Sequence, residues 1–180
     1  DEFRGNWNSI FNPEVETDED GNILFGVTFL GYMNNFIEWR GDTIIKEDSL
    51  LGKSVFFLAK LDPGGNLLWH VILKGQSAVN MQELKVDHDN NIILLLHASH
   101  SFDAFQQSFE AGYNLLKLDQ NGELLWSERI IRASISNAGH ALSIACNNDI
   151  VLGGSIGKVR YDSVVIEITD FDTIFSYLYK

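Results

Sequence analysis

Apolar and β-branched runs of about five to eight residues alternate along this chain with short clusters of Asp, Asn and Gly. Runs of this length are typical of β-strands, and the polar clusters between them are typical of tight turns. No longer stretch shows the 3.6-residue period of an amphipathic helix. The pattern therefore predicts an all-β protein.

The same pattern recurs along the chain. Residues 60–69 read KLDPGGNLLW and residues 117–126 read KLDQNGELLW, at an offset of 57 residues. A polar cluster followed by an apolar run occurs three times, at residues 17–23, 86–92 and 144–150. Residues 164–175 look like a third copy of the Lys-Leu-Asp element that has lost its Trp and its Gly. The repeat predicts three modules, at about residues 9–73, 81–131 and 140–180.

Each module is expected to be a four-stranded antiparallel meander. In the second module the strands are predicted at residues 81–86, 92–97, 113–118 and 124–131. Residues 87–91 and 119–122 are expected to form hairpin turns, because Asn and Gly tolerate positive φ there. The link between the second and third strands is long in the first module, at residues 31–54, and shrinks to a few residues around Gly157 in the third.

Repeated meanders of this kind predict the blades of a β-propeller, in which neighbouring sheets pack face to face. Residues 1–180 are then a single propeller segment of about three blades. A closed ring needs about four to eight blades, so three cannot close one. We favour a fragment of a longer propeller. The alternatives are a ring completed by further copies of the chain and an open arc with apolar end faces.

The turn-and-strand motifs are similar to those of a known repeat family. Residues 18–23, 57–62 and 65–69 resemble the bacterial seven-bladed β-propeller repeat often called SBBP. The resemblance implies a propeller that is exported to the periplasm or cell surface of a Bacteroidetes-type bacterium. It also implies a larger parent protein, whose remaining blades would be partners of this segment. It implies no set of catalytic residues.

Composition narrows the choice of partners. The 180 residues include 13 Lys and Arg against 25 Asp and Glu, for a formal net charge of -12. A chain this acidic repels phosphates and has no basic run, which argues against a nucleic-acid partner. The apolar runs are too short to cross a bilayer as a helix, so no membrane span is expected.

Aromatic residues supply the first candidate binding site. Trp69 and Trp126 recur at one blade position and are expected to pack between neighbouring blades. Trp39 lies outside the repeat, in the long link of the first module, together with Phe36 and Arg40. Loops carried by a rigid scaffold are where binding residues concentrate, so these three residues are candidate ligand-binding residues.

The central channel of a propeller offers a second place for a site. The strands at residues 25–29, 94–97 and 152–155 could line it, or their hairpin mates could. Those three segments are mostly apolar or small, and His97 is the residue that stands out among them. We therefore include His97 as a further candidate for ligand binding.

Two of the polar clusters have the alternating oxygen spacing of a calcium-binding loop. The residues concerned are Asp18, Asp20 and Asn22 in the first and Asp87, Asp89 and Asn91 in the second. The twelfth position of such a loop supplies a bidentate Glu, but here it is Phe29 in the first and Ala98 in the second. We therefore favour plain turns and expect no cofactor, with calcium as the alternative.

Two functions remain. The favoured hypothesis is a non-catalytic binding or assembly module of an exported or cell-surface protein, which presents loops to a protein or glycan partner. It predicts exposed aromatic residues at the long link and no buried ionisable cluster. The alternative is a lyase or hydrolase with its site at the central channel. That enzyme would need polar residues converging from the innermost strands of adjacent blades.

Overall fold

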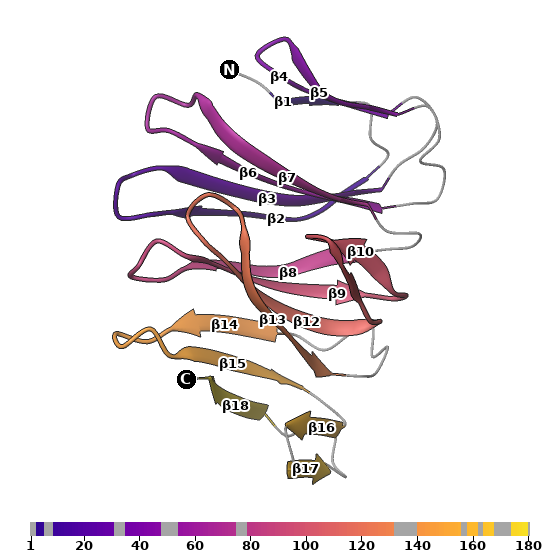
Figure 1. The fold of residues 1–180 in the computed structure, drawn as a ribbon, viewed down its shortest axis with the longest axis vertical. Coiled ribbons are helices and arrows are strands. Elements are labelled where there is room, and N and C mark those ends of the chain that lie inside the picture. The colour runs from indigo at the N-terminus through magenta and orange to yellow at the C-terminus, as the bar shows by residue number, and fades with distance from the viewer. Residues whose placement is uncertain are drawn as a thin grey trace.

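The computed structural model describes residues 3–5, 9–30, 35–47, 54–74, 79–131, 140–155, 158–161, 164–167 and 174–179. Every regular element in these residues is a β-strand, so the all-β prediction is confirmed. The described residues contain no helix with the length and apolar character needed to cross a membrane. The main sheets are stacked in chain order, and we name them blades 1, 2 and 3 (Figure 1).

Blades 1 and 2 are four-stranded antiparallel meanders of the same order. Blade 1 consists of β2 (Ser9–Thr17), β3 (Ile23–Leu30), β6 (Ser54–Leu61) and β7 (Leu67–Lys74). Blade 2 consists of β8 (Val79–Val86), β9 (Ile92–Ala98), β12 (Gly112–Leu118) and β13 (Leu124–Ile131). The four strands predicted for the second module are confirmed to within two residues at each end.

Blade 3 departs from the prediction at its third strand. It pairs β14 (His140–Ile144), β15 (Ile150–Ser155) and β18 (Ile174–Tyr179) in that order. The expectation that residues 164–175 repeat the Lys-Leu-Asp element, which ends the third strand of the other modules, is wrong at its start, because β17 (Val164–Glu167) pairs with β16 (Lys158–Tyr161) in a separate hairpin. The link after β15 is therefore long rather than a few residues around Gly157. An apolar run identifies a strand but does not identify the strand it pairs with.

A small hairpin is inserted between the second and third strands of every blade. In blade 1, β4 (Asn35–Trp39) and β5 (Asp42–Glu47) form it, and β1 (Phe3–Gly5) pairs with β4. In blade 2, β10 (Phe102–Ala104) pairs with β11 (Gln107–Phe109), and in blade 3 β16 pairs with β17. Residues 35–47 of the inserted segment at 31–54 therefore form a hairpin.

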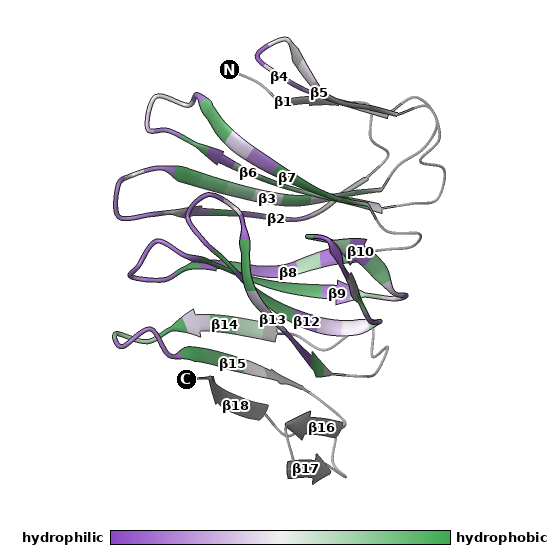
Figure 2. Ribbon diagram, in the orientation of Figure 1, coloured by the Kyte–Doolittle hydropathy of each residue, from purple (hydrophilic) through white to green (hydrophobic). Residues whose placement is uncertain are grey.

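Side chains on the two faces of a central strand pack against the neighbouring blades on either side. Leu94 of β9 packs toward blade 1 in a buried cluster that includes Phe56, because successive residues point to opposite faces of a sheet. Its neighbour Leu95 packs toward blade 3 in a buried cluster that includes Leu152. This burial on both faces explains the continuous apolar runs of the central strands, such as β3 and β9 (Figure 2).

The face of blade 1 that points away from blade 2 is also buried. Its apolar cluster comprises Val27, Phe29, Val55, Phe57 and Ala59. The β1-β4-β5 sheet lies on this side of blade 1 (Figure 1), and we name it the cap. Arg40, between β4 and β5, donates a hydrogen bond to Asn66 Oδ1 of the β6–β7 turn at 2.8 Å. The cap is thus attached to the end blade of the stack.

Five hairpin turns share one backbone geometry. In each turn the first N–H donates to the fifth carbonyl, and the fourth N–H donates to the first carbonyl. The fourth residue has a positive φ, a conformation that Gly and Asn adopt more readily than other residues. The fourth residues are Gly21, Gly65, Asn90, Gly122 and Asn148, with φ between 62° and 85°.

Asn side chains at this fourth position connect the first turns of successive blades. Asn90 Oδ1 accepts a hydrogen bond from the N–H of Glu19 at 2.9 Å. In the next blade, Asn148 Oδ1 accepts from the N–H of His88 at 3.0 Å, and its Nδ2 donates to Asp89 at 2.8 Å. We name this series the turn ladder. It runs along one side of the stack (Figure 1).

A bulge in the outer strands explains the Leu-Leu-Trp segment of the repeat. The register of β7 shifts so that Leu67 and Trp69 lie opposite consecutive residues of β6, and Leu68 is extruded to 52% exposure. As a result Leu67 packs on one face of blade 1, and Trp69 packs on the other face, toward blade 2. Trp69 Nε1 donates to the carbonyl of Gln120 in blade 2 at 3.0 Å. The expected packing of this Trp between blades is confirmed.

Candidate functional site

The Asp residues that have calcium-loop spacing hold the turns together. Asp18 Oδ1 accepts hydrogen bonds from the N–H groups of Asp20 and Asn22, at 3.1 and 2.8 Å. Asp87 Oδ1 accepts in the same way from Asp89 and Asn91, at 2.9 and 2.8 Å. The second carboxylate oxygen of each Asp accepts from the side-chain amide of the Asn four residues on. These contacts support the interpretation of both segments as turns.

A lysine from the third strand of the same blade completes each of these sites. Lys60 Nζ lies 2.8 Å from Asp18 Oδ2, with side-chain exposures of 6% and 0%. Lys117 Nζ lies 2.7 Å from Asp87 Oδ2. Each ammonium group thus supplies the positive charge beside a carboxylate that a bound cation would otherwise supply.

Hydrogen bonding dominates the electrostatics of these two Asp residues. Burial alone would raise the pKa of Asp18, but hydrogen bonds from Lys60 and Asn22 outweigh it and lower the pKa below 3.8. The pKa of Asp87 is lowered in the same way, by Lys117 and Asn91 against the effect of burial. Both residues are therefore charged at neutral pH and act as structural anions.

The candidate aromatic site lies on the cap. Trp39 ends β4 and is half-buried, and the guanidinium carbon of Arg40 lies 5.6 Å from the centroid of its ring. Arg40 also donates to Asn66 and to the carbonyl of Gly64, so it joins the cap to blade 1. Phe36 lies on β4 opposite Lys46, and its side chain is outside the described residues. The structure therefore brings Trp39 and Arg40 together and gives Arg40 a docking role.

His97 lies in a different blade from the aromatic candidates. It is on β9, on the face that points toward blade 3, and its ring centroid is 4.6 Å from that of Tyr113. Its Nε2 is buried without a hydrogen-bond partner in the part of the chain that the structure describes. Burial lowers the pKa of His97 below 6.5 and keeps the ring neutral at pH 7.

The innermost strands are the hairpin mates of the segments that contain His97 and its counterparts. β2 contacts β8, and β8 contacts β14, whereas β9 is flanked by β8 and β12. The first strand of each blade is therefore the inner one. This arrangement removes His97 from the inner surface.

Charged residues that the sequence analysis missed converge on the inner strands. Lys85 of β8 donates a hydrogen bond to Glu16 of β2, and Glu14 and Glu83 lie on the same two strands. Burial and the nearby charge of Glu14 raise the pKa of Glu83, although Lys85 opposes the shift. The Glu-x-Glu and Glu-x-Lys spacing was a usable signal, because alternate residues of a strand share one face.

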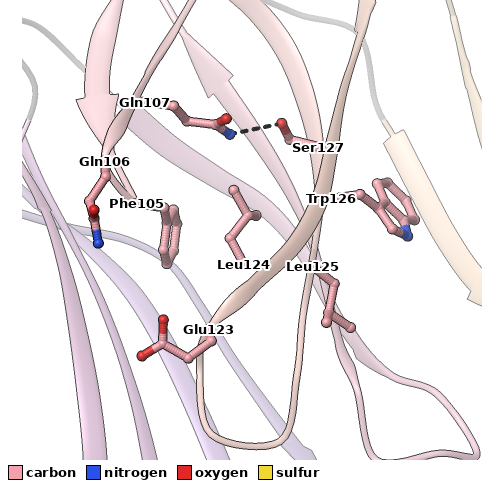
Figure 3. Close-up of a pocket in the computed structure, with 8 residues that line it drawn as sticks. All are labelled: Phe105, Gln106, Gln107, Glu123, Leu124, Leu125, Trp126 and Ser127. Carbon is pink, nitrogen blue, oxygen red and sulfur yellow. Dashed lines mark hydrogen bonds between the residues drawn. The ribbon is translucent and has the colours of Figure 1, made fainter.

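The described residues form a groove on the outer rim of blade 2. It has a volume of about 550 Å³ and lies between the β10–β11 hairpin and β13 (Figure 3). Eight residues line it: Phe105, Gln106, Gln107, Glu123, Leu124, Leu125, Trp126 and Ser127. We name it the hairpin groove. The sequence analysis missed it because the long link of the second module was not expected to fold back on the last strand.

Two side chains fix the width of the hairpin groove. Gln107 Nε2, from β11, donates to Ser127 Oγ of β13 at 3.1 Å (Figure 3). Leu124 and Phe105 pack against the apolar cluster between blades 1 and 2, so they form the base of the groove. A rigid blade therefore supports one wall of the groove, and an inserted hairpin forms the other.

No family model matches the chain, and no curated protein matches it.

Proposed function

We propose that the protein is a non-catalytic binding module whose partner, a glycan or a protein segment, binds in the hairpin groove. The observation that carries this proposal is the groove itself. Its volume of about 550 Å³ is within the range of roughly 300–1,000 Å³ that is usual for ligand sites. The groove combines four apolar or aromatic side chains with four polar ones, so a ligand could make both kinds of contact there.

The architecture around the groove supports the same function. Each blade keeps a constant set of central strands and carries its own hairpin between the second and third strands. Variable segments on a constant scaffold are where binding sites concentrate. The similarity of the turn motifs to the SBBP repeat supports placement of the module in a larger propeller protein at a bacterial surface, with further blades as its partners.

A binding screen with matched variants tests the proposal. The full chain is applied to a glycan array and a peptide array, and each hit is repeated with Gln106→Ala and with Gln120→Ala. Both glutamines are exposed on blade 2, but only Gln106 lines the groove. We expect hits that weaken at least fivefold with Gln106→Ala and stay unchanged with Gln120→Ala. If Gln106→Ala leaves the binding of every hit unchanged, or if there are no hits, the groove is rejected as the binding site.

The charged inner strands favour a second candidate function, a lyase or hydrolase. Glu83 has a raised pKa, whereas Glu16 is paired with Lys85, so the two carboxyl groups differ in environment as acid–base pairs do. A screen for cleavage of soluble polysaccharides tests this candidate. It requires turnover that Glu83→Gln abolishes and that Gln82→Ala, on the same strand, preserves. Turnover that survives Glu83→Gln, or no turnover by the unmodified chain, rejects it.

A further inference from the structure

The polar side chains of the hairpin groove disfavour anionic ligands. Its four polar side chains are two amides, a hydroxyl and a carboxylate, from Gln106, Gln107, Ser127 and Glu123. None of the eight lining residues is Lys, Arg or His. The chain also carries a net charge of -12. A phosphate, sulfate or carboxylate ligand would meet repulsion here without a compensating cation.

These side chains suit a ligand that both donates and accepts hydrogen bonds. Nε2 of Gln107 is used by Ser127, which orients the Gln107 carbonyl as an acceptor and leaves the Ser127 hydroxyl proton as a donor. Gln106 offers both kinds of group, and Glu123 offers an acceptor. Sugar hydroxyl groups have this dual character. A largely apolar ligand would leave these polar groups without partners.

The base of the groove offers a small apolar surface. Figure 3 shows the Phe105 ring between Gln106 and Leu124, next to the open space of the groove. Phe105 and Leu124 are both only partly buried. A pyranose ring has an apolar C–H face and a polar rim, so it can pack on this surface while its hydroxyl groups reach the amides.

The backbone of the β10–β11 turn holds Phe105 and Gln106 in an uncommon conformation. Phe105 and Gln106 have φ values of 49° and 60°, in the region that Gly and Asn favour. Each such residue costs about 1 kcal/mol. The equivalent turn of the cap places Gly41 at its second central position, where blade 2 has Gln106. Strain of this kind clusters at ligand sites, and here it directs both side chains of the turn to the groove.

We propose that the hairpin groove binds a neutral carbohydrate, a short oligosaccharide or the end of a glycan chain. This inference rests on the proposed binding function and specifies the chemistry of the ligand. Phe105 supplies the stacking surface, while Gln106, Gln107 and Glu123 bind the hydroxyl groups. A peptide is the competing ligand, and the experiment below separates the two.

The experiment measures binding of defined trisaccharides to the full chain by saturation-transfer and chemical-shift NMR. The neutral probes are cellotriose, maltotriose, xylotriose and chitotriose, and trigalacturonic acid is the anionic control. We expect at least one neutral probe to bind and the anionic probe to bind at least tenfold more weakly. Gln106→Ala and Glu123→Gln should each weaken neutral binding at least fivefold, whereas Gln120→Ala should leave it unchanged.

Four results would overturn the inference. If Gln106→Ala leaves the affinity for the sugar unchanged, the ligand binds elsewhere on the chain. Equal or tighter binding of trigalacturonic acid contradicts the charge argument. If no neutral probe binds but array peptides bind in a Gln106-dependent manner, the carbohydrate inference fails and the proposed binding function survives. If neither class binds, both fail. Thermal unfolding of each variant verifies that the fold is intact.

Discussion

Lys60 and Asp18 form an ion pair of 2.8 Å that is almost completely removed from solvent. The pair joins the third strand of blade 1 to the turn between its first and second strands. Lys60 Nζ also donates to the carbonyl of Gln120 in blade 2 at 3.3 Å. One side chain therefore ties together three segments of two blades.

Removal of Lys60 alone is expected to destabilise the protein strongly. Lys60→Met leaves the Asp18 carboxylate buried without a cation, which costs about 3 kcal/mol of unfolding free energy. The double variant Lys60→Met/Asp18→Leu removes both charges and should recover more than half of that loss. Urea denaturation measures both values. A single-variant loss below about 1 kcal/mol would contradict the structural role of the pair.

Acidic pH is expected to lower the stability of the protein by protonating two carboxylates, those of Asp18 and Asp87. Asp18 and Asp87 have folded pKa values below the ordinary 3.8, because hydrogen bonds outweigh burial. A lowered pKa contributes stability that is complete above the unfolded value and is lost as pH falls through the folded value. We expect this contribution to be constant from neutral pH to about pH 5 and to fall below about pH 4. Denaturation of Asp18→Asn and Asp87→Asn across this range should show a shallower fall than the unmodified chain shows.

The turn ladder predicts a local effect that can be measured residue by residue. Asn90→Gly removes the side-chain bonds but tolerates the φ of 62°, as Gly21 does in blade 1. We expect a loss of about 1 kcal/mol and faster hydrogen exchange at the amide of Glu19. Asn148→Gly should do the same at His88. Each variant is the control for the other, and an equal effect at both amides would contradict the ladder.

The stability effects of substitutions at Gly122 in blade 2 and at Trp69 in blade 1 are expected to be coupled. Gly122 has a φ of 85°, and a Cβ there would lie 3.2 Å from the Trp69 ring. We expect Gly122→Ala to cost about 2 kcal/mol, in part from backbone strain and in part from this contact. The cost should be smaller in a Trp69→Leu background, because the contact is then relieved. Equal costs in both backgrounds, measured by thermal unfolding, would mean that the effect is backbone strain alone.

Local sequence patterns were sufficient for the four meander strands and the two hairpin turns of the second blade. The apolar run of β9 and the Asp-Asn cluster that precedes it are short-range signals, and both were interpreted correctly. Pairing was harder, because β17 is a strand in either interpretation and its partner β16 is specified only by the fold. The cap hairpin was missed for a similar reason. Its turn is Arg40-Gly41 rather than the Asn-Gly or Asp-Gly that signals such hairpins.

The candidate site was less predictable than the fold. Trp39 and Arg40 were selected because they lie outside the repeat, and the structure shows that Arg40 binds the β6–β7 turn. The hairpin groove depends on the approach of Gln107 to Ser127, which are 20 residues apart. Nothing in the local sequence indicates that approach, since it results from the direction in which the inserted hairpin leaves the sheet.

The turn ladder also bears on the order in which the molecule assembles. Strands within a blade are mostly neighbours in the chain, whereas the ladder bonds join residues 59 to 71 positions apart. Contacts between distant residues require the closure of long loops, so they form late and slowly. Each blade can therefore fold before the ladder closes. On partial unfolding, neighbouring blades should separate along the ladder before either sheet dissolves.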